Sequence, residues 1–263
     1  MKKFLVIVLL CAGSCLAQSS FDGTWKANLN NVQFSQKPDV FSLQNGIYKC
    51  SSCVPPYQVK ADGTDQPIQG QQSYDSIAVK QVDDHTVHLT RKLKGKVVGE
   101  STQTAEGNNL KVNFTDHTPT GEDVKGNFNM VRVGKAVPGA HPISGSWKME
   151  KLSQLSENAL TTIFKTQGDQ LSMKSPAGDS YTAKFDGKDY PYQGNYGINQ
   201  VSLRRVDPNT IEETDKKDGK VLGVARMTLS PDGKKIQVAY TDKVMNTSMK
   251  YEMDRQPTVE GAK

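Results

Sequence analysis

The stretch FDGTWK at residues 21–26 decides the fold, because the chain repeats its pattern as ISGSWK at residues 143–148. The chain has two tryptophans, Trp25 and Trp147, and each stands in one of these copies. Each copy also opens a run of about 110 residues that is rich in short alternating segments. The repetition predicts two copies of one fold in tandem.

Further matches between the two halves support this duplication. At an offset of 124, KADGTDQP (60–67) matches KFDGKDYP (184–191), VDDHTV (82–87) matches VDPNTI (206–211) and GKVVG (95–99) matches GKVLG (219–223). The offset grows to 126 between LKV at 110–112 and IQV at 236–238. Insertions therefore fall in turns while the segments between them are kept, as expected for two copies of one fold.

Hydrophobic residues within each copy recur with a period of two. Val87 and Leu89 share one face of their segment, as do Leu110 and Val112. Asp-Gly, Lys-Gly and Asn-Gly turn signals separate such segments at intervals of about 8–12 residues, which is typical of sandwiches and barrels. Sequential strands joined by tight turns favour an up-and-down arrangement, and closure into a barrel removes exposed sheet edges.

We therefore predict an all-β protein made of two tandem up-and-down antiparallel β-barrels of about eight strands each. The first barrel is expected at residues 18–134 and the second at residues 143–256. Residues 135–142 contain two prolines and are expected to link the barrels. Residues 257–263 are expected to form a flexible tail.

The first 17 residues have the pattern of a signal peptide. Lys2 and Lys3 precede an apolar run at residues 4–10, and Cys15-Leu16-Ala17 fits a small-x-small cleavage site. The run is shorter than the ~20 residues that cross a bilayer, and no later stretch approaches that length. We expect a periplasmic or secreted protein. In an alternative interpretation, AGSC at residues 12–15 resembles a lipobox, and Cys15 would carry a lipid anchor.

Charge and cysteine content limit the functions that the sequence supports. The formal charge of +5 becomes +3 without Lys2 and Lys3, and no basic block remains, so nothing supports nucleic-acid binding. Cys50 and Cys53 are the two cysteines after residue 17, and in an oxidising compartment they are expected to form a disulfide. A redox or metal role for this CSSC motif is the alternative.

The Gly-x-Trp motif resembles the start of the first strand in lipocalins and their calycin relatives. In that superfamily an arginine from the last strand lies across the tryptophan ring. Arg132 and Arg255 stand near the ends of the two copies, so the resemblance implies the closing pairs Trp25–Arg132 and Trp147–Arg255. Another lipocalin motif is echoed only by Thr-Asp at residues 115–116 and 241–242, without its tyrosine.

Three polar residues of the second copy occupy positions that alternation assigns to the interior. Glu213 and Asp215 share a face with Ile211, and Arg205 shares one with Leu203. Three interpretations are open: a buried Arg205–Glu213 ion pair, a pocket that orients a ligand head group, or strand ends that reach solvent.

The sequence contains no recognisable catalytic constellation, and the four histidines lack metal-ligand spacing, so we expect neither an enzyme nor a cofactor or metal. The resemblance implies a protein that binds or carries a small apolar or amphipathic molecule in the cell envelope. The alternative is a structural or interaction module whose barrels are filled by side chains and hold no small molecule.

Overall fold

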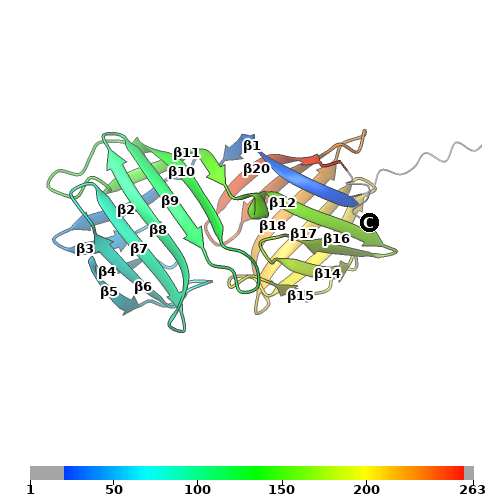
Figure 1. Cartoon of the computed structure of the whole chain (residues 1–263), viewed down its shortest axis with the longest axis horizontal. Helices are drawn as coiled ribbons and strands as arrows, with labels where there is room; N and C mark the ends of the chain where they lie inside the picture. Colours follow the sequence, from blue (N-terminus) through cyan, green and yellow to red (C-terminus); the bar gives the residue numbers. More distant parts are fainter. Residues whose placement is uncertain (1–20, 258–263) are drawn as a thin grey trace, which may run out of the picture.

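Two antiparallel β-barrels of ten strands lie side by side in the computed structural model, which describes residues 21–257 (Figure 1). The all-β prediction with two barrels is confirmed, but each barrel has about ten strands rather than eight. The predicted signal peptide, Cys15 and residues 258–263 of the predicted tail lie outside the described residues.

Barrel 1 is a ten-stranded sheet with the order β4-β3-β2-β11-β10-β9-β8-β7-β6-β5. Its strands are β2 (Asp39–Gln44), β3 (Ile47–Cys50), β4 (Tyr57–Lys60), β5 (Asp62–Pro67), β6 (Ser76–Gln81), β7 (Thr86–Leu93), β8 (Lys96–Glu106), β9 (Asn109–Asp116), β10 (Val124–Val133) and β11 (Gly145–Leu155).

Barrel 2 closes through hydrogen bonds with the order β1-β12-β13-β14-β15-β16-β17-β18-β19-β20. Its strands are β1 (Gly23–Phe34), β12 (Thr161–Gln167), β13 (Gln170–Lys174), β14 (Ser180–Lys184), β15 (Tyr190–Gln193), β16 (Gln200–Asp207), β17 (Thr210–Lys217), β18 (Lys220–Leu229), β19 (Lys235–Asp242) and β20 (Thr247–Arg255).

The first strand of each copy belongs to the barrel of the other copy. β1 pairs with β12 and β20, so the blue strand in Figure 1 lies among the green and red strands of barrel 2. β11 pairs with β10 and β2 and completes barrel 1. The domain limits predicted at residues 18–134 and 143–256 therefore do not describe the barrels, because each barrel contains one strand from the other range.

A hairpin between the two copies is part of this exchange. Residues 134–144, which include the predicted linker, connect β10 to β11 as a hairpin loop inside barrel 1. Antiparallel strands that follow one another in sequence commonly pair. Once β11 occupies the place between β10 and β2, β1 has no position in barrel 1 and fills the gap between β12 and β20.

The chain crosses from one barrel to the other at two places. Residues 35–38 lead from β1 to β2, and the short helix α1 (Glu157–Leu160) leads from β11 to β12. Asn158 of α1 donates hydrogen bonds from Nδ2 to the carbonyl oxygens of Glu122 (3.0 Å) and Asp123 (3.1 Å), which ties the crossing to the loop before β10. Within residues 21–257, no helix is long and apolar enough to span a bilayer.

Each barrel has its own hydrophobic core, which follows from the alternation in the sequence. Val87 and Leu89 point into barrel 1, and Ile236 and Val238 point into barrel 2. Trp147 belongs to the core of barrel 1 and Trp25 to that of barrel 2, in agreement with the exchange.

In each barrel the tryptophan of the exchanged strand packs against an arginine of the neighbouring strand. The Cζ atom of Arg132 lies 4.0 Å from the ring centroid of Trp147, and that of Arg255 lies 4.2 Å from the ring of Trp25. Both distances are within the range of a cation–π contact. The predicted pairs Trp25–Arg132 and Trp147–Arg255 are not formed, because the first strands have changed barrels.

The glycine of each Gly-x-Trp motif makes room for this closure. Gly145 has a φ of +145°, and a Cβ atom there would lie 2.5 Å from Nη1 of Arg132. Arg132 donates from Nη1 to the carbonyl oxygen of Ser144 (2.6 Å) and from Nη2 to that of Pro142 (2.6 Å). Gly23 has a φ of +126° and lies against Arg255 in the same way. Both positive φ values favour glycine.

The end strands of barrel 1 meet through a side chain instead of a regular ladder. The amide of Gln66 on β5 accepts from the backbone N–H of Lys60 on β4 (2.8 Å) and donates to its carbonyl oxygen (2.9 Å). This pair of bonds satisfies backbone groups that an open sheet edge would leave free.

Double-mutant cycles test the exchanged closure. Coupling between Trp25→Leu and Arg255→Met is expected to be about 0.5–2 kcal/mol, because these two side chains are in contact. The control cycle of Trp25→Leu with Arg132→Met should show coupling below about 0.5 kcal/mol, as for residues that do not touch. Urea unfolding of the four proteins in each cycle supplies the free energies. Equal coupling in both cycles would contradict the exchange.

Candidate functional site

Each barrel has a cavity that its inward-facing side chains line. The barrel 2 cavity has a volume of about 390 Å³ and the barrel 1 cavity about 350 Å³. The barrel 2 cavity is lined mainly by apolar side chains from β12, β13 and β17–β20, including Phe164, Met173, Met227, Met249 and Met253. Small-molecule sites typically occupy about 300–1,000 Å³ and combine apolar walls with a few polar groups.

The mouth of each cavity is met by a loop from the other barrel. Val124, at the end of the β9–β10 loop of barrel 1, lines the barrel 2 cavity, while Met245 of the β19–β20 loop lines the barrel 1 cavity. Thr120 in the β9–β10 loop donates from Oγ1 to the carbonyl oxygen of Gly178 in barrel 2 (3.2 Å). Access to either interior therefore involves the contact between the barrels.

Two carboxylates enter the barrel 2 cavity from one strand. Glu213 and Asp215 are two residues apart on β17, so alternation directs both inward. Tyr181 on β14 donates a hydrogen bond from Oη to Oε2 of Glu213 (2.5 Å). Asp215 is only 5 % exposed, and its Oδ1 atom has no hydrogen-bond partner among the residues that the structure describes.

Burial and mutual repulsion keep this pair partly protonated. Burial raises the pKa of Glu213 to about 8, and the neighbouring charge of Asp215 adds to the effect. Burial also raises the pKa of Asp215 to about 6. Near pH 7 one proton therefore remains on this pair of carboxyl groups. We place it on Glu213, because that carboxyl group has the higher pKa. Such a pair can accept a cation or hold a proton inside an apolar chamber.

A third carboxyl group and several tyrosines complete the surroundings. Asp179 lines the same cavity, and burial raises its pKa. It accepts from Nδ2 of Asn195 (3.3 Å) and from Oγ of Ser175 (3.4 Å). Tyr192, Tyr240 and Tyr251 also line the cavity. We call Asp179, Glu213 and Asp215 the acidic cluster.

Arg205 does not join the acidic cluster. It lies near the end of β16, its residue is exposed, and its guanidinium stacks on Phe185 with Cζ 4.3 Å from the ring centroid. Its backbone is opposite Ile211, two positions before Glu213 on β17. The Arg205–Glu213 ion pair considered from the sequence is therefore absent. For Arg205 the structure matches the third interpretation, a strand end that reaches solvent.

The equivalent positions of barrel 1 carry different chemistry. Arg91 is opposite Gly99 just as Asp215 is opposite Gly223, so the two residues occupy the same place in the repeat. Nη2 of Arg91 lies 2.8 Å from Oδ1 of Asp116 in an ion pair. Leu89 occupies the place of Glu213.

The predicted disulfide between Cys50 and Cys53 is present and lines the barrel 1 cavity. It joins the end of β3 to the segment before β4. Strand-like flanks, with Pro55 and Pro56 following, give neither cysteine a helix N-terminus of the kind that lowers thiol pKa values in redox motifs.

Three of the four histidines lie on or near the strands of barrel 1, and two of them flank one glutamate. Nε2 of His88 and Nε2 of His117 are each 3.6 Å from a carboxylate oxygen of Glu100, and Nδ1 of His117 is 3.0 Å from Oδ1 of Asp123. Across residues 21–257, no group of three or more His, Cys, Asp or Glu side chains has an arrangement that could hold a metal ion.

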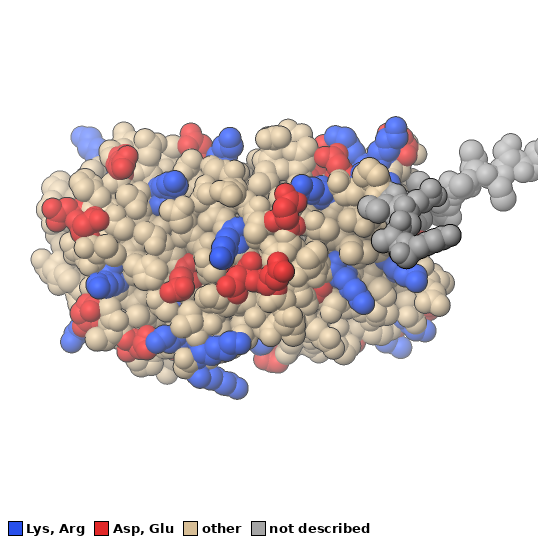
Figure 2. Space-filling view, in the orientation of Figure 1, with Lys and Arg blue, Asp and Glu red and all other residues tan. Residues whose placement is uncertain are grey.

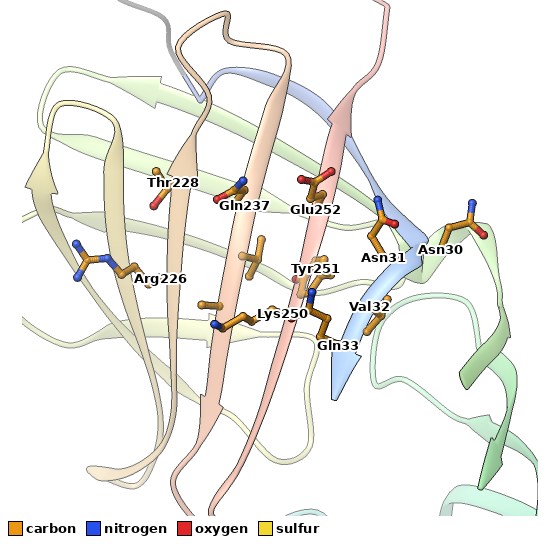
Figure 3. Close-up of a pocket in the computed structure, with 12 residues that line it drawn as sticks. Asn30, Asn31, Val32, Gln33, Arg226, Thr228, Gln237, Lys250, Tyr251 and Glu252 are labelled. Carbon is orange, nitrogen blue, oxygen red and sulfur yellow. The ribbon is translucent and has the colours of Figure 1, made fainter. Parts of the chain in front are cut away.

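The largest hollow, about 650 Å³, is an open groove outside barrel 2 (Figure 3). It forms because β1 bows away from β20: the pairing stops at Asn28–Glu252 and resumes at Gln33–Lys250. Asn30, Asn31 and Gln33 of β1 line it together with Gln237 and Glu252. Its lining is mainly polar, so we place the candidate site in the barrel 2 cavity, where apolar core side chains surround a few buried polar groups.

Charges on the outer surface are mixed. Figure 2 shows lysines and arginines interspersed with aspartates and glutamates over both barrels on the visible face. No continuous basic patch appears on that face, as seen for the described residues.

Sequence reasoning found two of the acidic residues but missed Asp179 and Tyr181. A signal for Tyr181 exists, because it alternates with Ala183 as an inward residue of β14. Its contact with Glu213 could not be predicted. The two residues are 32 positions apart, and their contact depends on how their strands face each other across the barrel.

Comparison of the sequence with models of known protein families and with curated proteins gave no match. The site is therefore interpreted from its geometry and chemistry.

The acidic cluster should make stability depend on pH. The folded pKa of Glu213, about 8, exceeds its ordinary value of 4.5, so between these values the folded state binds more protons than the unfolded state. Raising the pH from 5 to 8 should therefore lower the free energy of unfolding, by on the order of 2 kcal/mol from this group. Glu213→Gln should reduce that loss.

Urea unfolding of both proteins across this pH range measures the effect as the difference between their profiles. Glu212→Gln, on the opposite face of β17, is the control for loss of one carboxylate and should follow the wild-type profile. Identical profiles for Glu213→Gln and the wild type would show that Glu213 titrates normally.

Proposed function

We propose that the protein is an exported, lipocalin-like binding protein that holds one small apolar or amphipathic molecule in the barrel 2 cavity. The proposal rests on the cavity of about 390 Å³ that the inward-facing side chains of barrel 2 line. Barrels of this size are either filled by side chains or hold one small ligand, and here space remains.

The lining suits a ligand with an apolar body. Four methionines, Met173, Met227, Met249 and Met253, line the cavity together with Phe164. Methionine side chains are unbranched and polarisable and adapt to different shapes, which is why they are common on adaptable binding surfaces. The few polar groups gather on β17 and around Asp179, so an amphipathic ligand has a polar end to orient.

Features of the fold support the lipocalin-like part of the proposal, and two further features support export. The Gly-x-Trp motif, the arginine across its ring and the antiparallel barrel occur in both halves. The Cys50–Cys53 disulfide and the signal-like residues 1–17 suit an oxidising compartment. The ten strands and the exchanged first strands depart from the single eight-stranded barrel on which the resemblance was based.

Filling the cavity tests the proposal. Ala225 lines it and is opposite Glu213 and Tyr240, so Ala225→Phe should occupy the space and weaken binding of the neutral fluorophore N-phenyl-1-naphthylamine at least about tenfold. The matched control is Ser101→Phe, because Ser101 has the equivalent position in barrel 1 and lines that cavity. Fluorescence titration measures affinity, and thermal unfolding checks that both variants fold.

Retention of wild-type affinity by a folded Ala225→Phe variant would contradict the proposal. So would the absence of any probe binding by the wild type, which would favour the alternative of an interaction module. Loss of binding only in Ser101→Phe would move the site to barrel 1 and contradict its placement in barrel 2.

A further inference from the structure

We infer that the barrel 2 cavity selects an amphipathic cation, an alkylamine or alkylammonium compound whose positive end lies between Glu213, Asp215 and the neighbouring tyrosine rings. The inference rests on the proposed function, because it names the ligand class of the same cavity.

The first argument is the charge inside the cavity. Asp179, Glu213 and Asp215 line it, whereas the described residues of its lining include no lysine, arginine or histidine. A buried carboxylate without a counter-charge is costly, and natural interiors normally pair or protonate such groups. A cationic ligand would supply the missing partner.

The second argument is the unfilled hydrogen-bonding capacity of Asp215. The residue is 5 % exposed, lines the cavity, and has an Oδ1 atom without a hydrogen-bond partner within the described part of the chain. A carboxylate oxygen is an acceptor, so the group that satisfies it must be a donor or a cation. The Asp215 side chain also hydrogen-bonds to the carboxyl group of Glu213, which itself accepts from Tyr181, so the ligand would meet Asp215 at Oδ1.

The third argument is the aromatic wall. Tyr192, Tyr240 and Tyr251 line the same chamber as the carboxylates. Aromatic faces attract ammonium groups, most strongly where water is excluded. Carboxylates and tyrosine rings around an apolar chamber therefore suit an ammonium group on an apolar chain better than they suit a fatty acid.

Barrel 1 provides an internal comparison with the same scaffold. There Arg91 replaces Asp215, Leu89 replaces Glu213, and Arg91 forms an ion pair with Asp116. Barrel 1 thus has an arginine paired with a carboxylate at this position, whereas barrel 2 has a carboxylate without a basic partner in its described lining. The duplicated cavities have diverged in charge at a position fixed by strand register.

The ionisation of the cluster predicts how affinity changes with pH. The groups that face Glu213 and Asp215 are Tyr181 on β14, Tyr192 on β15, Tyr240 on β19, Tyr251 on β20 and Asp179. A cation binds the ionised carboxylates best, so its affinity should rise as the pH increases from about 5 to 8. At pH 7 binding should release a proton, chiefly from Glu213.

Isothermal titration calorimetry with three probes that share an eight-carbon chain tests the inference. Octyltrimethylammonium should bind at least about tenfold more tightly than 1-octanol, and octanoate should bind most weakly. Asp215→Asn and Glu213→Gln should each reduce octyltrimethylammonium affinity at least about tenfold and reduce octanol affinity by a smaller factor. Glu212→Gln, on the outer face of β17, should bind all three probes like the wild type.

Both variants remove an ionisable carboxyl group and keep the side-chain shape, and near-UV circular dichroism shows whether they fold. Equal affinities for octanol and octyltrimethylammonium, or unchanged cation binding in both variants, would overturn the inference and leave the carrier function standing. Absence of binding for all three probes would overturn both.

Discussion

The contact between an exchanged tryptophan and the terminal arginine of the receiving barrel is the interaction on which this architecture depends. Trp147 enters barrel 1 beneath Arg132, and Trp25 enters barrel 2 beneath Arg255. Each indole N–H also donates to a carbonyl oxygen four residues earlier, that of Phe21 for Trp25 and that of Ile143 for Trp147, both at 2.8 Å. Neither barrel has its tenth strand without the other half of the chain, so the two barrels form one folding unit.

The exchange also brings a loop of each barrel to the cavity of the other barrel. Because the chain crosses twice, the β9–β10 loop reaches the mouth of barrel 2 and the β19–β20 loop reaches that of barrel 1. The duplicated sequence therefore places two similar chambers against each other. Barrel 1 contains an internal ion pair, while barrel 2 retains carboxylates without a basic partner in its described lining.

The repeat, the alternation and the Gly-x-Trp motif were enough to predict two antiparallel barrels and the arginines that close them. They did not predict the exchange. In either arrangement, a strand with the Gly-x-Trp motif pairs with a strand that carries a closing arginine. The exchanged and unexchanged arrangements differ only in register and connectivity. The predicted number of strands, about eight per barrel, was too low, and segments such as DGTDQP, which forms β5, have the composition of a turn. Of the site, Glu213 and Asp215 were found by alternation. Arg205 was assigned to the same interior, since sequence does not show where a strand reaches the end of a barrel.

A disulfide cross-link tests the exchange most directly. Lys26 on β1 is opposite Asp254 on β20, whereas without exchange it would be opposite Val131, the residue of β10 equivalent to Asp254. Directly opposed antiparallel residues have Cα atoms about 4.5–5.5 Å apart, which a disulfide can bridge. Peptide mapping after mild oxidation should find the bond in the Lys26→Cys/Asp254→Cys protein and not in the Lys26→Cys/Val131→Cys protein. A bond in the second protein and none in the first would contradict the exchanged architecture.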